Sequence, residues 1–255
     1  MTVSVTAAAR ARARERLIFA LDVSSLREAG ALVRTLQGSV GSFKVGKQLF
    51  LANGPRVVNY LRERGAEVFL DLKFHDIPQT VARASVEATR LGVAMFNVHA
   101  SGSAAMMNET QAQVRRVCRA EKLRRPRMLA VTVLTSLSVG DLETIGVNGE
   151  VEDQVVRLAV LAKESGMDGV VASPREIVSI RAACGPRFLI VTPGIRRSSD
   201  AMGDQHRTSG PAQAIEDGAD FIVVGRPIRD APDPCAEADK IVDEIAEALA
   251  ARRRR

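Results

Sequence analysis

The feature that most constrains the fold of this chain is a repeated alternation of short β-rich runs with amphipathic helical patterns. The runs that we interpret as strands are 17–23, 42–45, 67–73, 94–99, 128–134, 169–172, 188–191 and 220–224. The main helical patterns are 26–36, 80–91, 104–121, 152–165, 175–182, 211–217 and 235–251. Such an alternation over 255 residues predicts a (β/α)8 TIM barrel of class α/β, in a single domain. An open doubly wound sheet is the alternative, but it would more often be smaller or carry a second domain.

Basic residues gather at the two ends of the chain. The net charge of +6 and a pI of about 9.7 suggest a nucleic-acid partner at first sight. However, residues 1–16 and 252–255 together carry +7, so the region between them carries −1. One Tyr and no Trp also leave little aromatic surface for stacking bases. We therefore expect a disordered Arg/Ala-rich leader over 1–16, the barrel over 17–251, an Arg tail over 252–255 and no nucleic-acid partner.

The sequence also limits the compartment in which the protein works. No apolar run approaches the roughly 18 residues of a membrane span, so we expect no membrane partner. Cys118, Cys184 and Cys235 are scattered and show no metal-binding or redox spacing. Free thiols suit a reducing compartment, and we expect a cytoplasmic protein.

The third predicted strand ends in a group of charged residues. It is apolar on both faces for most of its length, as is typical inside a parallel sheet. Alternation places Phe69, Asp71 and Lys73 on one face, and Asp76 follows shortly after. Charges at the end of a buried strand are costly unless they are paired. The series is therefore either a structural ion pair or a preorganised charged site, and we favour the charged site.

Polar residues also follow other predicted strands, at the end of the barrel where active sites of this fold lie. They are Asp22, Lys44, Asn97, His99, Thr135, Ser136, Arg196, Gly225 and Arg226. Each of them alone is a weak signal, and a lone His99 is more often a satisfied polar residue than a base. Their coincidence at several strand ends predicts one site.

The last two strand ends indicate a place for a phosphate group. Gly225 would let the backbone approach an anion, and Arg226 could bind phosphate with its forked donors. A plain turn with a surface arginine is the alternative. The polar stretch 194–208 beside this place is either disordered or a lid, and we favour a lid whose Arg196 and Gln205 reach the ligand.

Seven short motifs resemble the orotidine 5′-phosphate decarboxylase family in its shorter bacterial form. In chain order they are Leu-Asp-Val, Phe-Lys-Val-Gly, Asp-Leu-Lys-Phe-His-Asp-Ile-Pro-Gln-Thr-Val, Asn-Val-His-Ala, Val-Leu-Thr-Ser, Thr-Pro-Gly-Ile-Arg and Val-Gly-Arg-Pro-Ile. The resemblance extends from about residue 17 to the final helix. It implies a homodimeric barrel that converts orotidine monophosphate to UMP and carbon dioxide in de novo pyrimidine biosynthesis, without a metal or organic cofactor.

The resemblance also implies roles for the matching residues. Lys73 would protonate C6 of the pyrimidine, and Asp71 would lie against the departing carboxylate. Lys44, Asp71 and Lys73 would form a row of alternating charge that Asp76 of the partner subunit completes. Asp22 and Lys44 would bind the ribose, and Thr135 and Ser136 would contact the pyrimidine edge. Gln205, Gly225 and Arg226 would bind the phosphate, and Pro193 and Arg196 would contact the substrate elsewhere in the site. Ile77 and Thr80 would contribute to the neighbour's site.

Two other functions compete with this interpretation. The first is a magnesium-dependent sugar-phosphate decarboxylase or an aldolase-like barrel of the same wider family. That branch typically has an acidic metal ligand at the end of the second strand, where this chain has Lys44. The second is a catalytically silent barrel that binds a nucleotide. A lysine between two acids argues against it, because a binding module has no need of that arrangement.

Overall fold

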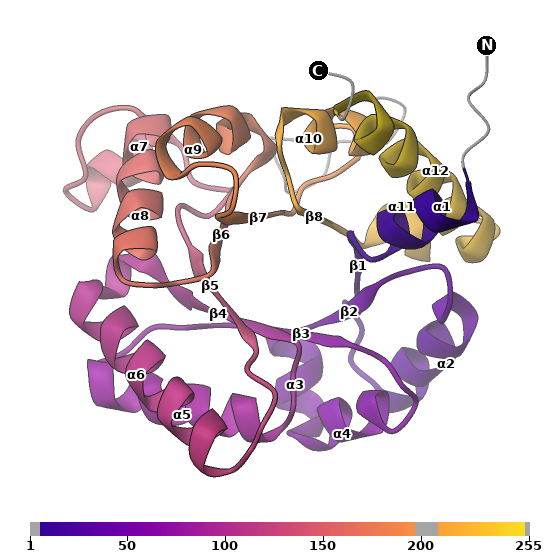
Figure 1. Cartoon of the computed structure of the whole chain (residues 1–255), viewed down its shortest axis with the longest axis horizontal. Coiled ribbons are helices and arrows are strands. Elements are labelled where there is room, and N and C mark those ends of the chain that lie inside the picture. The colour runs from indigo at the N-terminus through magenta and orange to yellow at the C-terminus, as the bar shows by residue number, and fades with distance from the viewer. Residues whose placement is uncertain (1–5, 197–208, 253–255) are drawn as a thin grey trace.

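Eight parallel strands form a closed barrel in chain order, and β1 pairs with β8 to close it (Figure 1). The computed structural model describes residues 6–196 and 209–252. The strands are β1 (Leu17–Ala20), β2 (Ser42–Gly46), β3 (Val68–Phe74), β4 (Met95–His99), β5 (Arg127–Val131), β6 (Gly169–Val171), β7 (Leu189–Thr192) and β8 (Phe221–Val224). The predicted (β/α)8 barrel is confirmed, and the open sheet is excluded.

Helices surround the barrel, as Figure 1 shows. They are α1 (Ala7–Arg14), α2 (Leu26–Leu36), α3 (Lys47–Asn53), α4 (Arg56–Arg62), α5 (Pro78–Arg90), α6 (Ala104–Ala120), α7 (Val139–Thr144), α8 (Val151–Glu164), α9 (Ile177–Cys184), α10 (Pro211–Asp217), α11 (Arg226–Arg229) and α12 (Pro234–Arg252), with 3-10 turns at Ala100–Gly102 and Pro174–Glu176. All predicted helices and strands are present, with small differences at their ends. The helical patterns did not include the short helices α1, α3, α4, α7 and α11.

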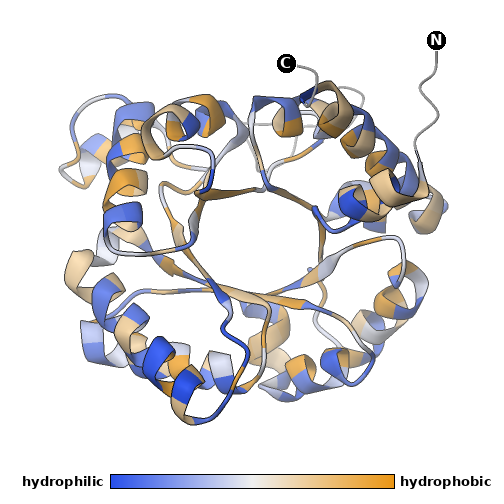
Figure 2. Cartoon of the chain, viewed as in Figure 1, coloured by the Kyte–Doolittle hydropathy of each residue, from blue (hydrophilic) through white to orange (hydrophobic). Residues whose placement is uncertain are grey.

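Two apolar layers stabilise this arrangement. One fills the inside of the barrel and includes Ile18, Phe69 and Met95. The other lies between the strands and the helices and includes Leu70. The alternation predicted for β3 is thus confirmed, since Phe69 and Leu70 belong to different layers. Figure 2 shows the same division on the helices, which are hydrophobic toward the barrel and hydrophilic on the outside.

The N-terminal segment differs from the expected disordered leader over 1–16. Residues Ala7–Arg14 form α1, because alanine and arginine are strong helix formers. The helix packs against α12, where Ala13 is fully buried and Arg10 Nε lies 2.8 Å from Asp243 Oδ1. The expectation was wrong because the alanine-rich face of this segment has a helix to pack against, which composition alone does not reveal.

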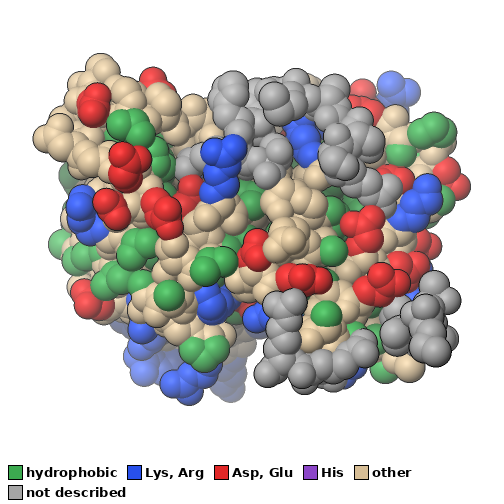
Figure 3. All heavy atoms as spheres, turned by 90° about the horizontal axis from the view of Figure 1, so that it is seen from above, with side chains coloured by type: hydrophobic (Ala, Val, Ile, Leu, Met, Phe, Trp, Pro, Cys, Tyr) green, Lys and Arg blue, Asp and Glu red, His purple; other side chains and the backbone are tan. Residues whose placement is uncertain are grey.

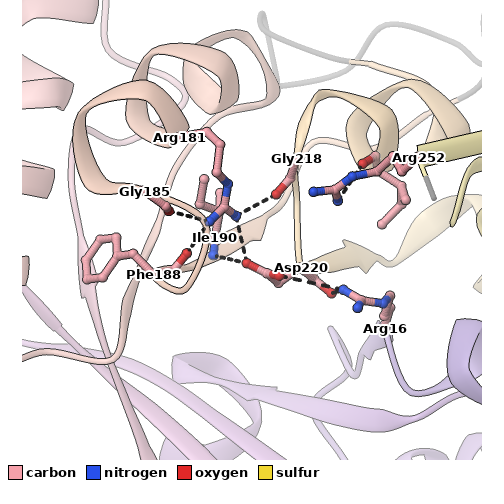
Figure 4. A network of polar contacts seen from close by, with 9 residues as sticks. Arg16, Arg181, Gly185, Phe188, Ile190, Gly218, Asp220 and Arg252 are labelled. Carbon is pink, nitrogen blue, oxygen red and sulfur yellow. Dashed lines mark hydrogen bonds and ion pairs between the residues drawn. The ribbon is translucent and has the colours of Figure 1, made fainter. Parts of the chain in front are cut away.

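The amino-terminal ends of β7, β8 and β1 are joined by a network around Arg181 and Asp220 (Figure 4). The two Nη groups of Arg181 donate to three backbone carbonyls and to Asp220 Oδ2, at 2.6–2.9 Å. Asp220 Oδ2 also accepts from the N–H of Ile190, and its carbonyl accepts from Arg16. Nearby, Arg252 ends α12 and donates to the carbonyl of Ile215, so this residue of the expected tail belongs to the fold.

The outer surface carries charges of both signs. On the face shown in Figure 3, acidic and basic side chains are interspersed with hydrophobic ones. Within the described parts of the chain, no helix combines the length and the apolar character needed to cross a membrane.

Candidate active site

A cavity opens at the carboxyl ends of the strands, where the sequence predicts a site. Its floor is apolar and consists of inward-facing residues of the barrel, including Phe69, Val131 and Val223. Polar side chains and glycines from β1, β2, β3 and the loops after β5, β7 and β8 form its walls. They include Asp22, Lys44, Asp71, Lys73, Thr135, Arg196, Gly225 and Arg226, and Pro193 lies among them. An apolar floor with a few convergent polar groups is typical of a small-molecule site.

β3 supplies the two charges at the centre of the cavity. Lys73 Nζ lies 2.6 Å from Asp71 Oδ1, so the predicted pairing of these residues is confirmed. The backbone that achieves it is irregular, because Lys73 has a φ of 54° and the pairing of β3 with β4 shifts register between Leu70 and Phe74. A non-glycine residue in the left-handed region is strained, and such strain is concentrated at functional sites.

β2 adds a second lysine to the same carboxylate. Lys44 lies in register with Phe69, and its side chain faces the barrel interior. Its Nζ lies 3.6 Å from Asp71 Oδ2 and 3.0 Å from Asp22 Oδ1. The side chains of Asp22, Lys44, Asp71 and Lys73 therefore form one continuous row, in which acidic and basic groups alternate.

Asp71 is ionised in spite of its burial. Burial raises the pKa of this carboxyl and is the largest single influence on it. The ammonium groups of Lys44 and Lys73 act in the opposite direction, and hydrogen bonds from Lys73 and Asn97 add to their effect. Together these contributions hold the pKa of Asp71 below its usual value, so the carboxylate is charged at neutral pH.

Two glycines lie close to the charged side chains of the site. A Cβ atom at Gly225 would lie 3.4 Å from Asp22 Oδ2, and one at Gly46 would lie 3.2 Å from Lys44 Nζ. Neither glycine has a positive φ, so the reason for glycine here is space rather than backbone conformation. Larger residues would crowd the charged groups that face the cavity.

Some of the predicted site residues lie elsewhere. Ser136 is exposed and lines a separate surface depression, whereas its neighbour Thr135 lines both. Asp76, Ile77 and Thr80 are exposed and are not part of the cavity wall. Gln205 and most of the expected lid lie outside the described residues.

Histidine 99 follows the apolar part of β4, close to a second imidazole. The rings of His75 and His99 are 5.3 Å apart. Burial, followed by the positive charges of His75, Lys73 and Lys47, lowers the pKa of His99 to about 4. Its imidazole is therefore neutral at pH 7. His99 does not line the cavity, and its interpretation as a satisfied polar residue stays a prediction.

The sequence signals did not assign a role to Asn97 of β4. The structure places its side chain between Asp71 and Lys73, with hydrogen bonds to both residues. The available signal was its position: alternation puts Asn97 on the same face as Met95, next to the strand that carries the charges.

The arrangement can transfer a proton and bind an anion. An ammonium group beside an ionised carboxylate is an oriented acid, and cationic Lys44 and Arg226 flank the same cavity. Among residues 6–196 and 209–252, no group of three or more His, Cys, Asp or Glu side chains forms a potential metal site.

The fold and the cavity together define a (β/α)8 barrel with a cavity lined by lysines and carboxylates at the carboxyl ends of the strands. A profile of the orotidine 5′-phosphate decarboxylase / HUMPS family matches residues 15–241, and the chain belongs to this family. It is 56% identical over 237 residues to orotidine 5′-phosphate decarboxylase of Syntrophotalea carbinolica, covering 93% of this chain and 97% of the relative. The protein of the same name from Geobacter sulfurreducens is 53% identical over 236 residues, which are 92% of this chain and 98% of that protein.

Solved structures agree with this assignment. The crystal structure of orotidine 5′-phosphate decarboxylase from Lactobacillus acidophilus superimposes with a TM-score of 0.80 at 36% sequence identity. The match covers 90% of this chain and 98% of that one.

Proposed function

We propose that this chain is an orotidine 5′-phosphate decarboxylase, which converts orotidine monophosphate to UMP and carbon dioxide in de novo pyrimidine biosynthesis. The observation that carries the proposal is the row of Lys44, Asp71 and Lys73 inside one cavity. Its support is the identity of more than half of the aligned residues to proteins of that name. We propose further that the reaction needs no metal or organic cofactor.

The chemical step follows from the position of Lys73. The bond between C6 of the pyrimidine and the carboxylate breaks, carbon dioxide leaves, and the electron pair stays on C6. The ammonium group of Lys73 gives its proton to C6, and the neutral amine regains a proton from solvent. Because Asp71 holds this ammonium at 2.6 Å before substrate binds, little reorganisation is needed when the negative charge develops.

Asp71 has a second role in the proposal, in which the substrate carboxylate leaves beside it. A negative charge that remains on Asp71 disfavours a second carboxylate beside it and does not oppose neutral carbon dioxide. The lowered pKa of Asp71 supports this role, because a protonated carboxyl would not repel the substrate.

The wall of the cavity supports an assignment of the substrate groups. Asp22 and Lys44 would bind the ribose hydroxyls, and Thr135 would contact the pyrimidine edge. Gly225 and Arg226 would bind the phosphate, with Gln205 from the expected lid, while Arg196 and Pro193 contact the substrate nearby. For Ser136, which is exposed outside the cavity, contact with the substrate requires a movement of its loop.

We also propose a homodimer in which Asp76, Ile77 and Thr80 complete the neighbour's site. The support is that this segment follows directly from the catalytic strand and yet stays outside its own cavity, with the side chain of Ile77 at 66% exposed. Mixing Lys73→Ala and Asp76→Ala chains after joint unfolding and refolding tests the dimer. If Asp76 acts in the neighbour's site, hybrid dimers restore activity to about one quarter of the sites. If it acts within its own chain, mixing restores none.

The reaction itself is tested by the absorbance change of orotidine monophosphate, with and without EDTA. We expect turnover that survives EDTA. Loss of turnover in EDTA would favour the magnesium-dependent branch of the family. Binding of UMP without any turnover would favour a silent nucleotide-binding barrel.

A further inference from the structure

Asn97 lies beside the charged row without lining the cavity. It belongs to β4 and follows Met95 of the inner layer by two residues, so it faces the barrel interior. Its side chain is fully buried. A buried amide among apolar side chains is costly unless its polar atoms are hydrogen-bonded.

Both ends of the Asn97 amide are bound by the charged row. Its Nδ2 donates to Asp71 Oδ1 at 2.7 Å, and its Oδ1 accepts from the backbone N–H of Lys73 at 2.8 Å. Chemistry fixes this orientation, because a carboxylate only accepts and a backbone N–H only donates. One amide therefore holds the side chain of Asp71 and the backbone of Lys73.

The backbone of Lys73 depends on such a bond. Its φ of 54° is unfavourable for a residue with a Cβ atom. Lys73 also lies within the register shift between Leu70 and Phe74, where the regular pairing of β3 with β4 is interrupted. There its N–H donates to the side chain of Asn97, which stabilises the irregular conformation.

The same amide determines which partner each carboxylate oxygen of Asp71 binds. Oδ1 accepts from Asn97 and from Lys73 Nζ, while Oδ2 faces Lys44 Nζ. Rotation of the carboxylate would break the bond to Asn97. Each lysine is thus held by a different oxygen atom, which keeps both ammonium groups in place in the unliganded site.

We propose that Asn97 is a positioning residue that stabilises the left-handed backbone of Lys73 and orients the carboxylate of Asp71, so that the ammonium group of Lys73 is held in place for proton transfer. The inference rests on the proposed decarboxylase function. Because Asn97 does not line the cavity, its effect falls on the chemical step rather than on the affinity for the substrate.

The first test is the Asn97→Ala variant, which loses both hydrogen bonds. We expect kcat to fall by about 10²-fold, with KM changed by less than about threefold. Affinity for UMP, measured by calorimetry, should remain close to that of the wild type. The matched control is Thr192→Val at the end of β7, where a fully buried hydroxyl has no hydrogen-bond partner among the described residues. Its kcat should not change.

The second test is Asn97→Asp, which keeps the shape and the acceptor for the N–H of Lys73. The introduced carboxyl can donate to Asp71 only when protonated, and two carboxyl groups at this distance share a raised pKa. We therefore expect the ratio of variant to wild-type kcat to rise as the pH falls. A residue that only supports folding would give a ratio that does not depend on pH.

The outcomes separate the two proposals. If Lys73→Ala is inactive but Asn97→Ala keeps wild-type kcat, the role of Asn97 is wrong and the proposed function stands. If Lys73→Ala keeps full activity, the proposed chemistry itself is wrong. If Asn97→Ala does not fold, the Asn97→Asp profile decides, and a flat ratio across pH overturns the positioning role.

Discussion

At the amino-terminal end of the barrel, Arg181 donates to three carbonyls and to Asp220, whereas at the carboxyl-terminal end Asp71 accepts from Lys73 and lies 3.6 Å from Lys44 in the wall of a cavity. Burial does not distinguish the two networks. The side chains of Arg181 and Asp220 are 16% and 20% exposed, and those of Lys44 and Lys73 are 13% and 25% exposed.

The difference lies in what the charges bind. The Nη groups of Arg181 bind the turns that precede β7 and β8, so the energy of these contacts stabilises the fold. Lys44 and Lys73 bind the carboxylates of Asp22 and Asp71, and all four side chains line a cavity. A ligand can therefore reach the charges at the carboxyl end, while the Nη groups of Arg181 are already bound by the fold. Removing a charge should therefore cost activity at one end and stability at the other.

The largest effect should come from Lys73→Ala. Without the ammonium group no oriented acid remains, and we expect kcat/KM to fall by at least about 10³-fold. Steady-state assays with orotidine monophosphate measure this loss, and circular dichroism should show an intact fold. Wild-type-like turnover in this variant would contradict the assignment of Lys73.

Arg226→Ala should have the next largest effect. Loss of a charge-assisted hydrogen bond to phosphate should weaken binding by about 2–3 kcal/mol, roughly 30- to 150-fold. Calorimetry should find weaker binding of UMP and unchanged binding of uridine, which lacks the phosphate. Equal affinity of the variant and the wild type for UMP would mean that the phosphate binds elsewhere.

Arg181→Met should have the opposite effect, a loss of stability with little change in activity. It leaves the partly buried Asp220 carboxylate without its closest partner, and we expect a loss of about 3 kcal/mol in the free energy of unfolding. Urea denaturation measures the loss, while kcat of the folded fraction should stay within about twofold of the wild type. Adding Asp220→Asn to the variant should recover part of the stability, since it removes a partly buried charge that Arg16, 3.7 Å from Oδ1, compensates less closely than Arg181 does. A fall in kcat without a loss of stability would contradict the purely structural role of the network at the amino-terminal end.

The smallest effect should be a pH dependence of stability that involves His99. Its pKa is about 4 in the folded chain, against an ordinary value of 6.5, so the unfolded chain binds the proton first as the pH falls. The folded state therefore loses stability between about pH 6.5 and pH 4. Replacement by His99→Asn should flatten the unfolding free energy across this window, in denaturation curves measured at several pH values. An equal slope for both proteins would contradict the shifted pKa.

The barrel could be predicted from the sequence because its signals are local and repeated. β-rich runs and amphipathic helices are visible one at a time, and their alternation leaves few topologies. The pairing of Asp71 with Lys73 followed from alternation along a single strand. In contrast, the contact of α1 with α12 joins the two ends of the chain, and no local pattern specifies it.

The register shift in β3 was also beyond the sequence, although it determines the site. Regular alternation along a strand does not predict the positive φ at Lys73. It also does not explain why Asn97, which has an amide side chain, lies in β4. The role of Asn97 depends on atoms of two neighbouring strands. The sequence does not show which polar residue of β4 will bind the backbone N–H of β3 where the regular pairing of the strands is interrupted. Ser136 shows the opposite error, because proximity to Thr135 in the chain does not ensure that both side chains reach one cavity.

The left-handed backbone at Lys73 has a consequence for engineering. Replacing non-glycine residues of positive φ by glycine is a common route to greater stability, and the described chain offers Lys73, Ser103 and Lys122 as targets. Lys122 lies in an exposed turn and is open to this change. At Lys73 the same change would relieve the backbone and delete the proposed proton donor. Thermostabilisation of this chain must therefore leave the left-handed backbone of Lys73 as it is.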